Sequence, residues 1–503
     1  MKIKELAQLS DEIKALKLAG KKIVHCHGVF DLLHIGHIRY LRQAGTFGDV
    51  LVVTVTPDQF VDKGPHRPAF DEKLRAEGIA SLGCVDFVAI NKWATAEETL
   101  RVLKPDFYVK GAEFKDMASD MTGKIGREVE VARTIGAQIV FADDIIFSSS
   151  NLINRYMSSF PKETQEYLEI FRERYQPDKI FTIMDSMASI KVLVIGDTIL
   201  DEYQYCSALG ISSKDPTLAL QYHSKDLFAG GVLAVANHLA GFVDIVQLTT
   251  LLGESERHEE FIRIQLEDNV NPFFFTHKGA PTTLKKRFVD GYSFNKMLEV
   301  YVMDDSGLPE DEDAQICNWL ADQLPNYDLV IAADFGHGAI SDRMVKTLEA
   351  HAPFLAVNTQ ANAGNRGFHT INRYQRADFV CLALHELNLA YRSKAVNERV
   401  LVEKAAKRLG CQKFVVTLGR RGCLVYQPGS IVTVPAFAQD VVDRVGAGDT
   451  FFSIASLAAY IGVDSEIIGF LGNVVGAEAV RVIGNQKSIQ KLAIKKHITS
   501  LLK

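Results

Sequence analysis

Residues 21–37 read KKIVHCHGVFDLLHIGH and join a short apolar run to a glycine and a histidine-rich turn. The apolar run predicts a buried strand that ends before Gly28, and residues from about 34 to 44 predict a helix. The first N–H groups of a helix are unpaired and carry partial positive charge, so a glycine turn at a helix start favours phosphate binding. This segment therefore predicts an α/β unit with a phosphate site at the end of its first strand.

Strand-like and helix-like stretches alternate along the rest of the chain in two blocks. The first block continues with the Val-rich stretch DVLVVTVT at residues 49–56, and the second opens with KVLVIGD at residues 191–197. Short β-rich runs that alternate with helices predict parallel sheets with crossover helices. Further strand candidates lie at residues 85–90, 107–109 and 138–141 of the first block, and at residues 244–252, 328–333, 354–358, 379–382, 413–418 and 423–427 of the second.

These blocks predict two α/β domains, at residues 1–160 and 190–503. A chain of 503 residues has room for two to four domains of roughly 100–200 residues each. Residues 161–189 are strongly charged, with apolar residues at helical spacing, and predict a linker of one or two exposed helices. A final helix of the first domain is an equally good interpretation of this segment.

Composition excludes several classes of protein. The formal charge of -6 argues against a nucleic-acid binder, which usually carries a basic excess. No apolar run reaches the length of a membrane span, and the first residues lack the apolar core of a signal peptide. Seven cysteines are scattered singly, as expected in a reducing compartment. We therefore expect a cytoplasmic protein whose partners are small molecules.

The histidine-rich turn carries chemistry. His34 and His37 are three residues apart and so lie on one face of the helix start, with Gly36 between them leaving room for a ligand. Two imidazoles placed there can donate hydrogen bonds to a triphosphate and to the charge that builds on its α-phosphate. A pair of histidines at this spacing is by itself more often a cap or part of a core, but the whole string after a strand favours a functional site.

The string GVFDLLHIGHIRYL resembles the signature of the cytidylyltransferase-like nucleotidyltransferases, over about residues 20–157. The resemblance implies a Rossmann-like fold and transfer of a nucleoside monophosphate to a phosphorylated acceptor, with release of pyrophosphate. Ser150 stands where the family's late motif has Thr, and Trp93 is either a base-side residue or a packed core residue. The resemblance implies catalytic roles for His34 and His37, and nucleotide or phosphate binding by Gly28, Phe30, Asp31, Gly36, Lys63, Arg67, Lys110, Gly111, Ser148, Ser149 and Ser150.

A second chemical motif, DRVGAGDTF, lies at residues 443–451. The backbone N–H groups of Gly446, Ala447 and Gly448 can converge on the charge of a transferring phosphoryl group. Asp449 follows directly and could accept a proton from a substrate hydroxyl. The acid immediately after the anion cradle makes this pattern more specific than a lone run of small residues.

The motif resembles that of the ribokinase-like pfkB carbohydrate kinases, over about residues 190–495, and this implies an α/β fold with a small β lid. The family pattern has Asn where this chain has Ala234 and Ala383, which puts the sugar identity and full kinase activity in doubt. The resemblance implies a catalytic Asp449, nucleotide binding by Thr417, Gly419, Gly446, Ala447, Gly448 and Asn473, substrate binding by Asp197, Asp201, Gly230, Gly231, Lys285, Arg287 and Asp443, and a link of Glu386 to Mg²⁺.

Together the halves resemble the bifunctional heptose kinase/adenylyltransferases, with the domain order reversed. This implies phosphorylation of a sugar or polyol with ATP, and transfer of CMP or AMP from CTP or ATP to a sugar phosphate, for a surface glycan. Mg²⁺ is expected in both halves, and a homodimer through the kinase lid. In the alternative, the kinase half is a weakly active, sugar-binding regulatory module.

Overall fold

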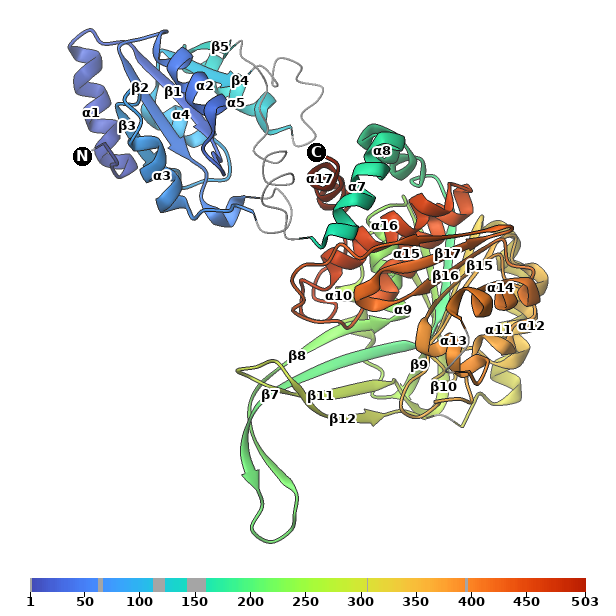
Figure 1. Cartoon of the computed structure of the whole chain (residues 1–503). Coiled ribbons are helices and arrows are strands. Elements are labelled where there is room, and N and C mark those ends of the chain that lie inside the picture. Colours follow the sequence, from blue (N-terminus) through green and yellow to red (C-terminus); the bar gives the residue numbers. More distant parts are fainter. Residues whose placement is uncertain (1, 62–66, 112–122, 143–159, 305, 394–396) are drawn as a thin grey trace. The chain divides into compact units, whose positions relative to one another are not determined.

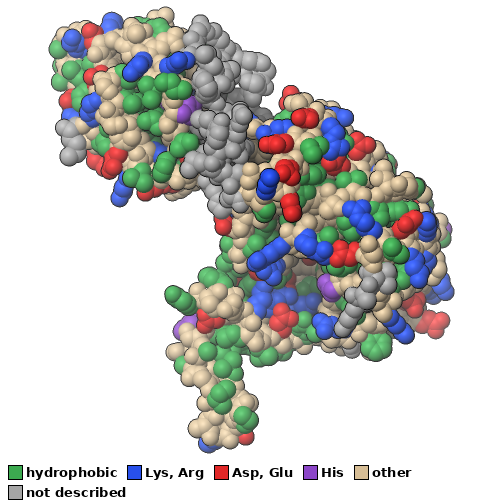
Figure 2. Space-filling view, in the orientation of Figure 1, with side chains coloured by type: hydrophobic (Ala, Val, Ile, Leu, Met, Phe, Trp, Pro, Cys, Tyr) green, Lys and Arg blue, Asp and Glu red, His purple; other side chains and the backbone are tan. Residues whose placement is uncertain are grey.

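A computed structural model of the chain describes residues 2–61, 67–111, 123–142, 160–304, 306–393 and 397–503. The chain divides into two compact units: Met1–Ser159 with Lys495–Lys503, and Phe160–Ile494. Basic and acidic side chains are interspersed on the face of the molecule seen in Figure 2, in keeping with the small net charge. No helix in the described ranges combines the length and the hydropathy of a bilayer-crossing segment.

The first unit is built on a five-stranded parallel sheet of order β3-β2-β1-β4-β5 (Figure 1). The order reverses beside β1, where β2 lies on one side and β4 on the other. Ligands of such doubly wound sheets bind outside the carboxyl ends of the strands at this switch point. The strands are β1 (Ile23–Gly28), β2 (Val50–Val55), β3 (Phe87–Ile90), β4 (Phe107–Gly111) and β5 (Gln138–Ala142); the helices are α1 (Leu6–Leu18), α2 (Ile35–Gly45), α3 (Glu72–Ala80), α4 (Glu97–Leu103) and α5 (Lys124–Thr134).

Both faces of this sheet are covered, so β1 and β2 are almost wholly buried. On one face, Leu9 and Ile13 of α1 pack against Ile23 and Val52, and Trp93 is partly buried against the same cluster. The expected α/β fold is confirmed, and the first strand includes Gly28 where it was expected to end one residue earlier. Trp93 therefore takes part in core packing.

The second unit has a nine-stranded sheet of order β10-β9-β6-β13-β14-β15-β16-β17-β18, parallel except for the last two strands. Its strands are β6 (Val192–Gly196), β9 (Val246–Ser255), β10 (Val270–Pro281), β13 (Leu329–Asp334), β14 (Leu355–Thr359), β15 (Phe379–Ala383), β16 (Lys413–Thr417), β17 (Cys423–Gln427) and β18 (Ser430–Val434). Its helices include α9 (Val232–Ala240), α10 (Glu259–Gln265), α11 (Glu310–Gln323), α12 (Asp342–His351), α13 (Leu384–Ala390), α14 (Glu398–Leu409), α15 (Ala447–Ile461) and α16 (Ser465–Ala479), and α17 (Lys491–Leu502) contains the boundary with the first unit.

A separate four-stranded sheet of order β12-β11-β7-β8 forms the expected lid. Its strands are β7 (Thr198–Ile211), β8 (Leu218–Gly231), β11 (Leu284–Asp290) and β12 (Lys296–Val302). Tyr203, Phe228 and Val289 form a small apolar core in this sheet. The β7–β8 hairpin runs on beyond the shorter strands β11 and β12 (Figure 1).

The segment expected to link the domains forms α7 (Lys162–Arg174) and α8 (Pro177–Ser186). Phe171 is fully buried, and its ring stacks on Phe470 of α16 with centroids 4.2 Å apart. The Tyr175 hydroxyl donates to Asp464 at 3.0 Å, and Arg174 pairs with Glu466 at 2.8 Å. These contacts join α7 to the second unit, which also contains α8.

Candidate active sites

In the first unit, the histidine-rich turn forms the start of α2. His34 is the N-cap of that helix, and its Nδ1 accepts a hydrogen bond from the Gly36 N–H at 3.1 Å. The imidazole rings of His34 and His37 stack with centroids 4.0 Å apart, and the Phe30 ring meets His37 edge-on at 5.4 Å. Because Nδ1 of His34 is an acceptor, its proton lies on Nε2 in the neutral ring. Burial lowers the pKa of His34, which favours this neutral form.

Asp31 and Arg67 lie together beside this turn. The Arg67 guanidinium pairs with the Asp31 carboxylate at 3.0 Å, with both side chains buried, and Asp31 also accepts the Ala69 N–H. A buried carboxylate that holds a guanidinium fixes its direction. The Asp31 carboxylate therefore holds the Arg67 guanidinium in place beside the turn.

Lys110 and Gly111 end β4, next to the end of β1. The Lys110 ammonium pairs with Glu128 of α5 at 2.7 Å, and the Tyr108 hydroxyl and the Ala96 N–H donate to the same carboxylate at 2.8 Å. Burial would raise the pKa of Glu128, but the charges of Lys110 and His27 and the hydrogen bonds from Lys110 and Ala96 together lower it to about 2. Glu128 was missed in the sequence, because its partner is 18 residues away on another element.

Two further histidines lie in the strand beneath the turn. His25 Nε2 and His27 Nδ1 are each 2.8 Å from the Thr54 hydroxyl, and His27 Nε2 is 3.2 Å from that of Thr56. Burial lowers the pKa of His25 to about 3 and that of His27 to about 4. Both are therefore neutral at physiological pH, and they serve as uncharged hydrogen-bonding groups.

The predicted residues of this site fall into two groups. Lys63, Ser148, Ser149 and Ser150 lie outside the described residues. The remaining predicted residues gather at the ends of β1 and β4, the switch point of the sheet.

In the second unit, Asp449 lies in the first turn of α15, directly after the glycine cradle. Gly446 caps the helix at a φ of 83°, and a Cβ there would overlap the Asn485 side chain, so only glycine fits. The Gln360 amide donates to Asp449 Oδ1 at 2.5 Å. Burial raises the pKa of Asp449 to about 7, while the Gln360 bond and the charge of Lys285 partly oppose this shift and Asp201 adds to it. The predicted substrate-side residues Asp201 and Lys285 thus act on the predicted base.

Asp201 lies at the root of the lid. It forms a buried ion pair with Arg287, whose Nε also donates to Glu299 at 2.9 Å. A Cβ at Gly230 would overlap the Asp201 carboxylate, and one at Gly231 would overlap the Asp197 carbonyl. The glycine pair therefore lets the lid strand pass close to both acids.

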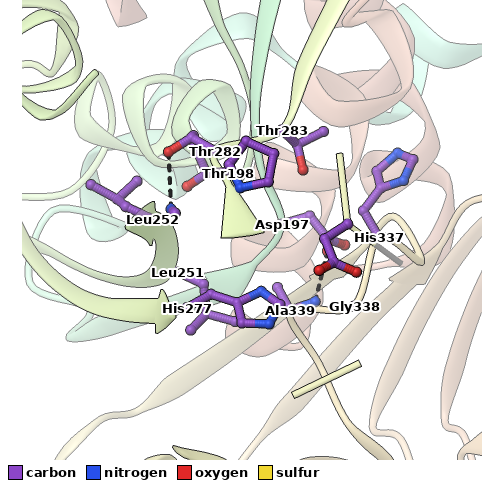
Figure 3. Close-up of a pocket in the computed structure, with 13 residues that line it drawn as sticks. Asp197, Thr198, Leu251, Leu252, His277, Thr282, Thr283, His337, Gly338 and Ala339 are labelled. Atoms are coloured by element: carbon purple, nitrogen blue, oxygen red, sulfur yellow. Dashed lines mark hydrogen bonds between the residues drawn. The ribbon is translucent and has the colours of Figure 1, made fainter. Parts of the chain in front are cut away.

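Asp197 follows β6 and is fully buried. Its carboxylate accepts the N–H groups of Phe335 at 2.8 Å and Ala339 at 2.9 Å. Burial, and then the charge of Asp334, raise the pKa of Asp197 to about 6. Figure 3 shows this carboxylate facing a pocket with His337 nearby; the lining includes Asp197, Thr198, Leu251, Leu252, His277, Thr282, Thr283, Asp304, His337, Gly338 and Ala339. Hydroxyls, imidazoles and carboxylates together suit a ligand rich in hydroxyl groups.

Asp443 joins the lid to the cradle. It accepts the Tyr203 hydroxyl and pairs with Lys296, both at 2.7 Å, and it also accepts the Gly484 N–H at 3.1 Å. Asp443 was predicted to bind substrate, and the structure shows its oxygens bonded to the protein. The Lys285 ammonium lies over the Tyr301 ring, 5.1 Å from its centroid, and burial lowers its pKa.

Glu386 lies at the start of α13. Its Oε2 accepts the Ala383 N–H at 2.7 Å and its Oε1 accepts the Ala361 N–H at 3.2 Å. Burial raises the pKa of Glu386 to about 7. No cluster of three His, Cys, Asp or Glu residues in the described ranges has the geometry to hold a metal ion. A Mg²⁺ ion that is held mainly by phosphate oxygens and water needs only one or two carboxylates, and Glu386 fits that requirement.

The remaining predicted nucleotide residues have different neighbours. Thr417 ends β16, with its hydroxyl 3.5 Å from the Leu382 carbonyl, and Gly419 begins a short helical turn at a φ of 60°. The Asn473 amide donates to the Val434 carbonyl at 3.2 Å and to Cys423 Sγ at 3.3 Å. Asn473 is therefore engaged in joining α16 to β17 and β18.

Comparison with known proteins agrees with this division. Residues 189–492 match the model of the pfkB family carbohydrate kinases, and residues 25–156 match that of the cytidylyltransferase-like family. The Bifunctional protein HldE of Geobacter metallireducens is 37% identical over 167 residues, which are 32% of this chain and 32% of that protein. The match thus spans about a third of the relative's length.

Solved structures show the fold of the second unit. Phosphofructokinase-2 from Escherichia coli, in complex with potassium, covers 62% of this chain and 99% of its own, with a TM-score of 0.52 and 15% identity. A ribokinase from Thermotoga maritima covers 62% and 99%, with a TM-score of 0.50 and 14% identity.

Proposed function

The chain belongs to the pfkB family of carbohydrate kinases, and on this premise we propose a bifunctional enzyme. Its second unit would transfer the γ-phosphoryl group of ATP to a hydroxyl of a sugar or polyol. Its first unit would transfer CMP or AMP from CTP or ATP to a sugar phosphate and release pyrophosphate. The product would be a nucleotide-activated sugar for surface glycan synthesis.

The observation that carries the kinase proposal is the environment of Asp449. Its carboxylate lies beside the Gly446–Gly448 cradle, and its pKa of about 7 suits a general base at neutral pH. In the proposed step, Asp449 accepts the proton of the sugar hydroxyl while the hydroxyl oxygen attacks the γ-phosphorus. The bond from the γ-phosphorus to the bridging oxygen breaks, and ADP leaves with its electron pair. The N–H groups at the start of α15 then stabilise the charge on the transferring group.

The transferase proposal rests on the histidines at the start of α2 and on two cations of other elements, Arg67 and Lys110. The imidazoles of His34 and His37 can donate to the α-phosphate, and Arg67 and Lys110 are each paired with a buried carboxylate near the ends of β1 and β4. An oxygen of the sugar phosphate attacks the α-phosphorus, and pyrophosphate leaves with the electron pair of the broken bond. Because the acceptor supplies the nucleophile, no covalent intermediate with the protein is needed.

We propose Mg²⁺ as the cofactor of both halves. In the kinase half, Glu386 would hold the ion together with phosphate oxygens and water. When bound, Mg²⁺ neutralises phosphate charge. The chain's own groups do the remaining work: Asp449 takes the proton and the cradle orients the γ-phosphate.

Mass spectrometry of the products tests the proposal. The full-length chain is incubated with ATP or CTP, Mg²⁺ and a panel of sugars and sugar phosphates that includes heptose phosphates. A sugar heavier by one phosphate confirms the kinase, and a nucleotidyl sugar confirms the transferase and identifies its base. Absence of both products across the panel would reject the proposal.

A second candidate is a transferase whose kinase half only senses sugar. It is favoured by Ala234 and Ala383, which stand where the family pattern has Asn. The nearby Asn237 does not replace either amide, because its side chain is bonded to the Gln265 carbonyl and the Glu267 N–H. In that case a sugar would alter pyrophosphate release without causing ADP release. Measuring both products in one reaction separates the two candidates.

We propose that the lid pairs two copies of the chain. Leu209, Ile211, Leu218, Leu298 and Val300 are exposed apolar side chains on its strands, and burial of such surface stabilises a dimer. A mass of about twice 55.8 kDa in light scattering would support this. A cytoplasmic location is proposed too, because the seven cysteines are all unpaired and both activities need nucleoside triphosphates.

A further inference from the structure

The turn after β14 contacts both carboxylates that the proposed kinase reaction uses. The Gln360 side chain donates to Asp449 Oδ1 at 2.5 Å, and the backbone N–H of the next residue, Ala361, donates to Glu386 Oε1 at 3.2 Å. Two consecutive residues therefore bridge the proposed base and the proposed metal-side acid. No motif that we identified in the sequence includes them.

The Gln360 backbone is held from several sides. Its N–H donates to the Asp334 carbonyl at 3.0 Å, and its carbonyl accepts the Asn365 amide at 3.4 Å. The amides of Asn362 and Asn365 also donate to the Phe335 carbonyl, at 2.9 and 3.1 Å. Phe335 begins the turn whose N–H groups bind Asp197. Gln360 thus emerges from a backbone that is tied to the sugar-side pocket as well.

A side-chain donor on one carboxylate oxygen has a specific effect. It fixes the rotation of the carboxylate and leaves the second oxygen, Oδ2 of Asp449, to meet the substrate hydroxyl. A hydrogen bond to the charged form also favours the ionised base that the reaction needs. The family pattern places an amide side chain at residue 383, where this chain has Ala383. Gln360 brings a side-chain amide to Asp449 from a different element.

We propose that Gln360 is a positioning residue of the kinase site, which holds the Asp449 carboxylate in the orientation that accepts the hydroxyl proton. This inference rests on the proposed kinase function. Gln360 acts through Asp449 and not on the substrate. Its loss should therefore lower kcat and leave the KM values for sugar and ATP nearly unchanged.

The test uses two variants that keep the shape of the side chain. Gln360→Met removes the donor, and Gln360→Glu replaces it with an acceptor. Since a hydrogen bond to a charged group contributes about 1.5–3 kcal/mol, kcat for sugar-dependent ADP release should fall roughly 10–100-fold in the Met variant. The Glu variant should lose more, because two carboxylates then face one another. Gln375→Met, an exposed position on the same connection, is the matched control and should behave as wild type.

Each outcome of these assays either supports or overturns the positioning role of Gln360. A lower kcat with KM values within about two-fold of wild type, and an unchanged melting temperature, supports the proposal. A wild-type kcat in either Gln360 variant overturns it while leaving the proposed kinase intact. A fall in the melting temperature with kcat and KM both impaired shows a structural role and also overturns it. If the wild-type chain releases no ADP with any sugar, the kinase proposal fails and the positioning role fails with it.

Discussion

The side chains that line the two candidate sites differ in charge. At the site of the first unit, burial lowers the pKa of His34, and two cations, Arg67 and Lys110, are each paired with a buried carboxylate. At the site of the second unit, the carboxylates of Asp197, Glu386 and Asp449 are buried and their pKa values are raised to between about 6 and about 7. Nucleotidyl transfer needs donors to a phosphate, whereas phosphoryl transfer to a hydroxyl needs a proton acceptor. The difference in charge matches the different reactions proposed for the two sites.

Both units should require Mg²⁺ for activity. Removing Mg²⁺ with excess chelator should reduce ADP release and pyrophosphate release to background, because each half must neutralise a triphosphate. Both products are measured in one reaction, and added Mg²⁺ should restore them. If either activity continues undiminished in excess chelator, that half neutralises the triphosphate charge with protein cations alone.

Asp449→Asn should separate the halves most strongly. The amide keeps the shape of the side chain but cannot take a proton, so ADP release should fall by roughly 10²–10⁴, the usual contribution of a general base. Pyrophosphate release from a supplied sugar phosphate should be unchanged, since that site is in the other unit. Steady-state assays of both products check this. Normal ADP release would assign the base to another residue.

His37→Ala should have the converse effect. Loss of a donor to the α-phosphate should lower pyrophosphate release by about 10²–10³, with ADP release unaffected. His223→Ala, an exposed histidine of the lid hairpin, is a control that should leave pyrophosphate release unchanged. Pyrophosphate release at the wild-type rate in the His37 variant would remove the histidine turn from the mechanism.

Local patterns made much of this architecture predictable. The alternation of apolar runs and helices indicated both parallel sheets, and the turn before α2 and the cradle before α15 were found because each function is encoded in adjacent residues. The helix α1 was not predicted, although Leu6, Leu9 and Ile13 have helical spacing. These apolar residues lie in a short, charged segment, and their packing against the sheet stabilises the helix.

Tertiary partners could not be predicted in the same way. Glu128 meets Lys110, and Gln360 meets Asp449, across elements whose pairing no local spacing reveals. The same holds for α7, because the stacking of Phe171 on Phe470 joins residues almost 300 positions apart.

The last prediction concerns pH, which should act on the two units with opposite sign. In the first unit, the pKa values of His25 and His27 are about 3 and about 4, below the ordinary 6.5. The unfolded chain therefore takes up protons first as the pH falls, and stability present above pH 6.5 is lost below it. In the second unit, the raised pKa values of Glu386 and Asp449 mean that the folded chain takes up protons first, below about pH 7. Its stability should therefore increase as the pH falls from 7.5 to 6.

The buried histidines of the second unit oppose this gain only in part. The pKa values of His238 and His337 are lowered to about 4 and about 3, but they are outweighed by the three carboxylates. Between pH 7.5 and 6 we expect the first unit to lose, and the second to gain, about 1 kcal/mol in the free energy of unfolding. Hydrogen exchange of the strand amides in each unit, corrected for intrinsic rates, measures both changes in the intact chain. Asp449→Asn should reduce the gain in the second unit alone. A change of the same sign in both units would contradict this prediction. It would show that burial does not both lower the histidine pKa values of the first unit and raise the carboxylate pKa values of the second.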